Sequence, residues 1–172
     1  MKNSNEKHNG MPNSHLHDLF INELKYMLSG EKQLVEALEE MSEVAKNKDL
    51  KEAFKNHKEE SEGHVDKLKL VFKSIDTQEE EEKCKSIESL IQEGKAMVKD
   101  FKDDEALDAA LIAAAQKIEH YEIASYGSLV TYAELMNHDK AKEILKEILS
   151  EEKEADEKLT DIAMSHVNKL EE

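Results

Sequence analysis

The stretch "LKEAFKNHKEESEGHVDKLKLVFKSI", residues 50–75, has the apolar periodicity of an amphipathic helix. At about 100° per residue, four polar side chains fall within an arc of roughly 100° that continues the apolar stripe. They are His57, Glu60, Ser61 and His64. The inward face of this helix is therefore polar over two helical turns, where leucines would be expected. The presence of a carboxylate and two imidazoles on that face needs a physical reason.

The same helical periodicity extends over most of the chain. It predicts four long helices at about 15–46, 50–75, 106–136 and 141–167, with a shorter helix in the connection 76–105. No alternating β-branched run bounded by turn residues is present. Two helical hairpins joined by one long crossover predict an all-α, ferritin-like antiparallel four-helix bundle, with the extra short helix in the crossover. We expect a disordered arm at 1–13 and a single ferritin-like domain at 14–170.

Three local expectations accompany this bundle. Gly30 lies inside the first helix at a cost of about 1 kcal/mol relative to Ala, which indicates a packing reason. Gly94 is a candidate break in the short helix, and Asp49 a candidate cap of the second long helix.

Charge and composition exclude several classes of partner. All 24 basic residues are Lys, and the formal net charge is −16. Because phosphate recognition favours Arg and a positive face, we expect neither nucleic acid nor an anionic membrane as a partner. The amino terminus lacks the apolar core of a signal peptide, and no run approaches the roughly 18 apolar residues of a membrane span. The lone Cys84 cannot form an internal disulfide, so the expected location is the cytoplasm.

Each of the four long helices interrupts its apolar stripe with acid near mid-length. Buried carboxylates without partners are costly, and several together repel one another. Two divalent cations would remove both problems. Carboxylate oxygen with imidazole suits Fe or Mn, Zn is also allowed, and no thiolate lies near enough for a zinc–thiolate site. The sequence therefore predicts a dinuclear metal site with these candidate ligands: Glu31, Glu60, His64, Glu119, Glu122, Glu152 and Asp156.

The spacing of these residues departs from the usual di-iron bundle pattern. Glu60 and His64 are separated by four residues instead of three, and the fourth helix offers Asp156 where that pattern has His. Either Glu of the third helix could be the main ligand. His57 could support the site or lie on an exposed face, and Tyr126 could bond a ligand carboxylate or simply fill the core. Cys84 is interpreted as incidental.

Four segments carry a resemblance to a known family. They are "HDLFINELKYMLSGEKQLVEAL", "HKEESEGHVDKLKLVF", "AALIAAAQKIEHYEIASYGSL" and "EEKEADEKLTDIA". They resemble the YciF/YciE-type ferritin-like stress proteins of bacteria over about residues 15–165. The resemblance implies a ferritin-like bundle, a dinuclear metal site and expression linked to stress, but no settled reaction. It supports five ligands in particular: Glu31, Glu60, Glu119, Glu122 and Glu152.

Two classes of function follow. The first is a ferritin-like stress protein with two divalent metal ions that handles Fe(II), O₂ or peroxide, with oxidase or peroxidase turnover left open. The alternative is a non-catalytic, dimeric helical protein that binds a partner and whose metal site is structural or vestigial. An iron-storage shell is disfavoured by the long crossover and the absence of a basic tail, and we expect a homodimer.

Overall fold

The fold is seen in a computed structural model that describes residues 10–168. Five α-helices make up most of this range: α1 (His17–Val44), α2 (Lys48–Ser74), α3 (Lys85–Phe101), α4 (Leu107–Leu135) and α5 (Asp139–Ile162). A 3₁₀ turn at Ser14–Leu16 precedes α1, and a π-helical turn at Ala163–Val167 follows α5. The predicted arm at 1–13 falls mostly outside the described residues, so its disorder stays a prediction.

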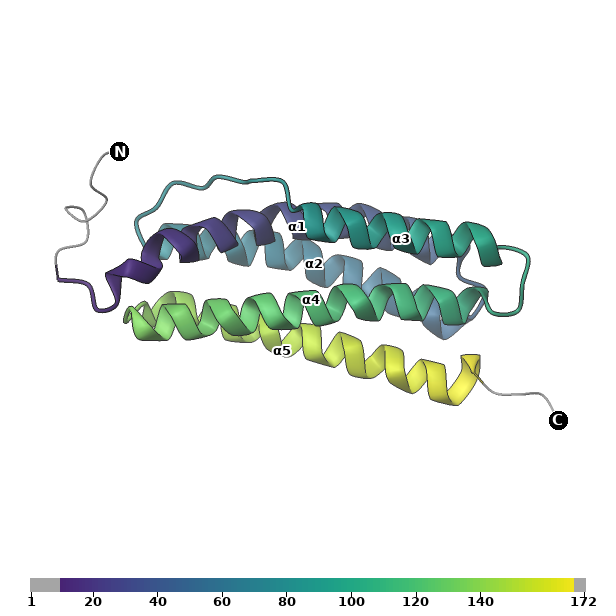
Figure 1. The fold of residues 1–172 in the computed structure, drawn as a ribbon. Helices are drawn as coiled ribbons and strands as arrows, with labels where there is room; N and C mark the ends of the chain where they lie inside the picture. Colours follow the sequence, from purple (N-terminus) through teal and green to yellow (C-terminus); the bar gives the residue numbers. More distant parts are fainter. Residues whose placement is uncertain (1–9, 169–172) are drawn as a thin grey trace.

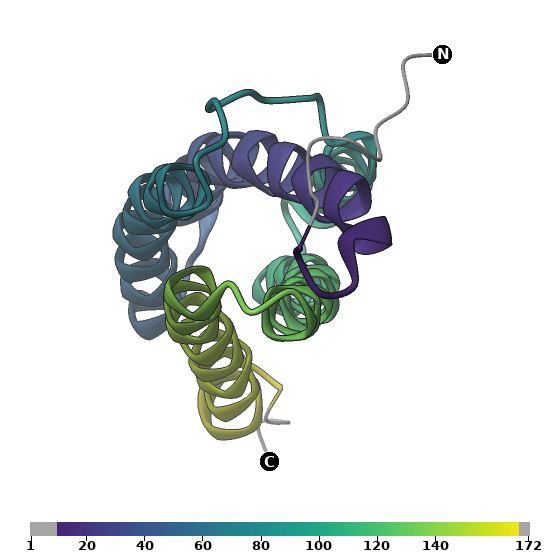
Figure 2. The ribbon, with the colours of Figure 1, turned by 90° about the vertical axis from the view of Figure 1, so that its left-hand side faces the viewer.

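The four long helices form the predicted antiparallel bundle (Figure 1). The hairpin of α1 and α2 packs against the hairpin of α4 and α5, and α2 lies beside α5. The segment after α2 returns along the bundle, and α3 then runs in the direction of α1. Seen along the bundle, α3 lies outside the ring of four, against α1 and α4 (Figure 2). Within residues 10–168, no helix combines the length and apolarity needed to cross a bilayer.

The turn between α1 and α2 is fixed by two polar side chains. The Asn47 carboxamide oxygen accepts hydrogen bonds from the backbone N–H groups of Asp49 and Leu50, at 2.9 and 3.0 Å. Asn47 is therefore the N-cap, and the expectation that Asp49 caps this helix is wrong. The Asp108 carboxylate accepts bonds from the backbone of Lys46 and Asn47, which ties the start of α4 to this turn.

The core consists of two apolar clusters, one toward each end of the bundle. The cluster near the α1–α2 turn is built on Leu38, Phe54 and Leu111. The cluster at the opposite end is built on Phe20, Phe72 and Leu145. Burial of such side chains contributes about 25 cal/mol per Å² of apolar surface, so these two ends hold the bundle together. The segment between them carries the polar residues.

Two glycines allow α3 to approach the bundle closely. A Cβ atom at Gly30 would lie 3.2 Å from Cδ1 of Ile87, so the packing reason expected for this glycine is contact between α1 and α3. A Cβ atom at Gly94 would lie 3.1 Å from the Cβ of Ala114 on α4. Because α3 is continuous from Lys85 to Phe101, the expectation that Gly94 breaks it is wrong.

We expect Gly30→Leu to destabilise the protein by about 1–3 kcal/mol, because the added side chain meets Ile87 and displaces α3. Urea unfolding measures the change. Gly63→Leu is the matched control: nothing lies within 4 Å of a Cβ there, and replacing a helical glycine is neutral or stabilising. Equal stability of the two variants would contradict this packing of α3.

Candidate metal centre

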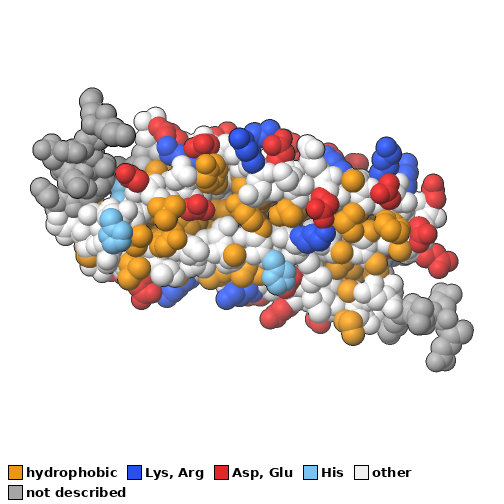
Figure 3. All heavy atoms as spheres, viewed as in Figure 1, with side chains coloured by type: hydrophobic (Ala, Val, Ile, Leu, Met, Phe, Trp, Pro, Cys, Tyr) orange, Lys and Arg blue, Asp and Glu red, His pale blue; other side chains and the backbone are white. Residues whose placement is uncertain are grey.

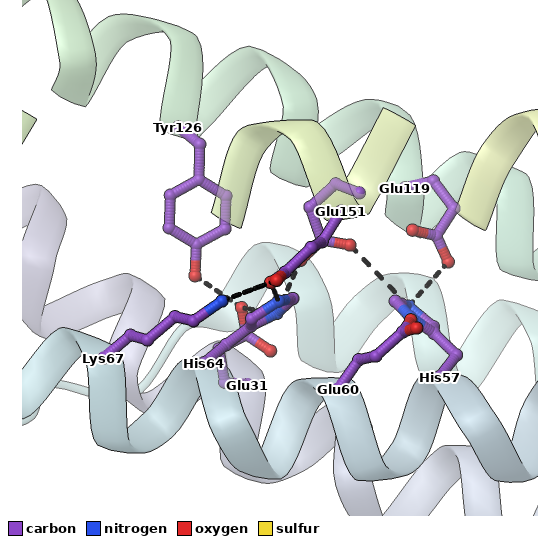
Figure 4. A network of polar contacts seen from close by, with 9 residues as sticks. Glu31, His57, Glu60, His64, Lys67, Glu119, Tyr126 and Glu151 are labelled. Carbon is purple, nitrogen blue, oxygen red and sulfur yellow. Dashed lines mark hydrogen bonds and ion pairs between the residues drawn. The ribbon is translucent and has the colours of Figure 1, made fainter. Parts of the chain in front are cut away.

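Polar side chains from all four bundle helices meet midway between the two apolar clusters (Figure 4). Helix α1 supplies Glu31, and α2 supplies two imidazoles seven residues apart. Helix α4 supplies two glutamates and α5 one. Each is at most 7 % exposed. The full set is Glu31, His57, His64, Glu119, Glu122 and Glu152.

One group of potential ligand atoms comes from α2, α4 and α5. It consists of His57, Glu119, Glu122 and Glu152, whose ligand atoms all lie within 4.8 Å of one another. Nε2 of His57 lies 3.1 Å from Oε1 of Glu119 and 3.7 Å from Oε2 of Glu152. Three carboxylates and one imidazole thus converge on one point.

The second group comes from α1, α2 and α5, and it shares Glu152 with the first. Nδ1 of His64 lies 2.9 Å from Oε1 of Glu152 and 3.3 Å from Oε1 of Glu31. The two oxygens of Glu152 therefore face different imidazoles. A carboxylate in this position could hold an ion of each group.

The outward nitrogen of each imidazole contacts a carboxylate nearer the surface. Nδ1 of His57 lies 3.3 Å from Glu60, and Nε2 of His64 lies 2.7 Å from Glu151. Glu151 also accepts bonds from Nζ of Lys67 at 2.6 and 2.7 Å. Metal-binding histidines commonly donate their second N–H to such a carboxylate, which turns the lone pair of the other nitrogen toward the ion. Both imidazoles have this arrangement.

The buried carboxylates lack the donors that burial requires. Both oxygens of Glu122 are buried, with no hydrogen-bond or ion-pair partner among residues 10–168. Oε1 of Glu119 and both oxygens of Glu152 have ion-pair contacts with the imidazoles and no other donor in that range, whereas Oε2 of Glu119 lacks even such a contact there. One oxygen of Glu31 accepts a hydrogen bond from the Tyr126 hydroxyl, while the other has none. Buried polar atoms in this state are rare in folded proteins unless a water or an ion satisfies them.

Electrostatics inside the cluster displaces several pKa values. Burial raises the pKa of Glu122 well above its usual range, and the charges of Glu152 and Glu31 raise it further. Burial raises the pKa of Glu152 to about 8 although its bond with His64 opposes this. For His64, burial lowers the pKa, but bonds with Glu152 and Glu31 outweigh it and bring the pKa to about 10. Without a cation, protons must neutralise the cluster.

Five of the seven ligands predicted from the sequence lie in these two groups: Glu31, His64, Glu119, Glu122 and Glu152. Either Glu119 or Glu122 could have been the candidate ligand of this helix, and both belong to the first group. Tyr126, left open above, bonds a candidate ligand, Glu31. Cys84, interpreted above as incidental, is buried, with Sγ 3.4 Å from the Tyr121 hydroxyl.

Glu60 and Asp156 are not placed with the others, and their predicted inward positions need correction. The Glu60 side chain is 48 % exposed and reaches His57 from the solvent side. It lies at the edge of the helical arc, where a small rotation of α2 decides between core and solvent. Asp156 follows Glu152 by one turn in the C-terminal half of α5, and the C-terminal end of this helix diverges from the bundle (Figure 1). Its carboxylate instead accepts a bond from Gln116 at 3.1 Å.

His57 occupies the place that the sequence analysis gave to Glu60. A usable signal was present, because His57 precedes His64 by seven residues, or about two helical turns, on the same face. His64 was paired with Glu60 in the prediction, whereas the other α2 residue in the buried cluster is His57.

The fold and the donor set define a ferritin-like four-helix protein with a carboxylate-rich centre. The chain belongs to the family described as a domain of unknown function, DUF892, whose model matches residues 15–171. It is 44 % identical over 155 residues to Protein YciF of Escherichia coli strain K12, covering 90 % of this chain and 93 % of that protein. The resemblance inferred from the sequence is thereby confirmed.

Solved structures agree with this assignment. The crystal structure of the E. coli stress protein YciF matches with a TM-score of 0.86, covering 90 % of this chain and 98 % of that one. YcfI of Rhodopseudomonas palustris matches at 37 % identity with a TM-score of 0.82, covering 84 % of this chain and 92 % of that one. A Xanthomonas campestris protein at 19 % identity, with a TM-score of 0.70, shares the fold.

The raised pKa values predict that the metal-free protein loses stability as pH rises. The Glu152 contribution is complete below its ordinary pKa of 4.5 and is lost as pH rises through about 8. The His64 contribution is complete below 6.5 and is lost as pH rises through about 10. Between pH 6 and 9, we expect the melting temperature of chelator-treated protein to fall by roughly 5–10 °C.

Scanning calorimetry across this pH range measures the fall. Glu152→Gln should flatten the dependence, whereas Glu36→Gln, at an exposed site on α1, should keep it. An unchanged slope in Glu152→Gln would contradict the assignment of the raised pKa to Glu152.

Proposed function

We propose that this protein binds two divalent metal ions, Fe or Mn, at the centre of the bundle and handles Fe(II), O₂ or peroxide under stress. The observation that carries the proposal is the sharing of Glu152 between two buried ligand groups. Each oxygen of Glu152 faces a different imidazole, so this carboxylate could bind one ion on each side. Buried acids without donors support the same conclusion, because cations would replace the protons that otherwise neutralise them.

The donor set fits two hard or borderline cations. His57, Glu119 and Glu122 would hold one ion, Glu31 and His64 the other, and Glu152 both. Carboxylate oxygen with imidazole suits Fe and Mn, and Zn is also accommodated. Such a pair of ions, when bound, supplies Lewis-acid or redox chemistry to a small oxygen-containing ligand.

The protein's own residues prepare the centre in three ways. Glu60 and Glu151 orient the two imidazoles from outside. The Tyr126 hydroxyl donates to Glu31 and limits the positions that this carboxylate can take. The apolar clusters on either side keep bulk water from the site along the bundle axis, so electrostatic interactions inside it are strong.

The stress context comes from a relative. The E. coli protein with 44 % identity is described as a stress protein, and we extend that role to this chain. The alternative remains a helical stress protein in which the metal ions are structural and a partner protein is bound. Homodimer formation and a cytoplasmic location stay predictions.

Metal content tests the proposal directly. After anaerobic loading with Fe(II) or Mn(II) and desalting, we expect about two ions per chain by elemental analysis. Glu152→Ala should lose most of this metal, because both groups lose their shared ligand. Glu157→Ala, on the exposed face of α5, is the matched control. Metal-free wild type after loading would overturn the proposal, and peroxide consumption above that of free metal would distinguish turnover from a structural role.

Removal of one unpaired acid should stabilise the metal-free protein. We expect Glu122→Leu to raise the free energy of unfolding by about 1–4 kcal/mol, because burial cost and repulsion disappear together. The same variant should show little stabilisation by added Mn(II). Thermal unfolding with and without metal measures both effects, with Glu134→Leu on the exposed face of α4 as control. A destabilised Glu122→Leu protein would mean that Glu122 is satisfied without a cation.

A further inference from the structure

A surface hollow of about 390 Å³ lies between α2 and α5. Its charged lining is strongly acidic. Five carboxylates and one ammonium group surround it: Asp49, Glu52, Glu60, Glu151, Glu154 and Lys158.

The floor of this hollow includes one residue of the candidate metal centre. His57 lines the hollow, yet its side chain is only 7 % exposed. Its Nδ1 contacts Glu60, which lines the same hollow, and its Nε2 lies 3.1 Å from Glu119 inside the cluster. The imidazole of His57 therefore lies between Glu60, which lines the acidic hollow, and Glu119 of the buried cluster (Figure 4).

We propose that this hollow is the route by which hydrated divalent cations reach the metal centre, with Glu60 as the last carboxylate before His57. The inference rests on the proposed function, since it assigns the loading path of the same centre. Glu60 is 48 % exposed, so its carboxylate can exchange water for an arriving ion while it still contacts the imidazole.

Electrostatics favours cations at this position over other small solutes. The excess of five carboxylates over one ammonium group in a concave surface raises the local concentration of divalent cations and speeds their association. The attraction acts over a Debye length of about 8–10 Å at 0.10–0.15 M salt, which spans a hollow of this size. A neutral oxidant such as peroxide gains nothing from this field.

A second hollow provides the contrast. It has a volume of about 120 Å³ and lies between α1, α3 and α4. Apolar side chains gather on the face of the bundle shown in Figure 3. Its lining includes Leu90, Val98 and Ile118, and none of the six clustered ligand candidates. Neither its chemistry nor its floor suits a hydrated cation on the way to the centre.

The kinetics of Mn²⁺ uptake tests the route. Metal-free protein is mixed with Mn²⁺ alone in a stopped-flow instrument, and a fluorescent divalent-cation indicator reports its disappearance. In Glu52→Gln/Glu154→Gln, we expect uptake to slow by about 3–10-fold at low ionic strength, and the difference to shrink as salt screens the field. The equilibrium content of about two ions per chain should be unchanged, because neither residue belongs to the ligand groups.

Two further variants make the test specific. Glu36→Gln/Glu43→Gln removes the same charge from exposed positions on α1 outside the hollow and should load at the wild-type rate. Asn56→Lys adds a cation within the hollow and should slow uptake as the double variant does.

The outcomes separate the route from the centre itself. If the double variant loads as fast as its control at low salt, the route is overturned while the metal centre stands. If the double variant loses metal at equilibrium, its acids are ligands and the route is again overturned. If the wild type retains neither Mn²⁺ nor Fe(II) after loading, the proposed function fails, and the route is overturned with it.

Discussion

The organising constraint of this protein is the burial of four glutamates and two imidazoles at the middle of a helical bundle. Glu152 holds this group together, because its two oxygens face His57 and His64 at once. The cost of burying these charges is offset by apolar packing at both ends of the same helices. The bundle can thus tolerate a centre that would be unstable without either protons or cations.

Contacts from outside complete the centre. Glu60 and Glu151 each reach an imidazole nitrogen that the cluster does not use, and Lys67 anchors Glu151. Partly exposed residues on α2 and α5 therefore determine the orientation of fully buried ones. The acidic hollow lies between these same two helices, so the residues that orient the imidazoles and the proposed path of the ions share one helix–helix interface.

The bundle and its connectivity were predictable because helical periodicity is local information. Observed helix ends lie within about two residues of the predicted ones, except where α5 gives way to the π-helical turn at Ala163–Val167. Five of the seven predicted ligand residues lie together in the buried groups, since an acid in the middle of an apolar stripe must face the core. Glu60 and Asp156 were misplaced because each lies near the boundary of its stripe, where helix rotation and the divergence of α5 decide exposure.

The sequence by itself determined the helices, the depth at which acids interrupt them, and the acidity of the chain, since these follow from residue order and composition. Only the tertiary structure decided which atoms meet. It joined Glu152 to both imidazoles, made His57 a candidate ligand and Glu60 its outer partner, and opened the hollow beside them. The physical reason is that rotations and tilts of a few degrees between packed helices are set by side chains distant in sequence, and no single helix contains that information.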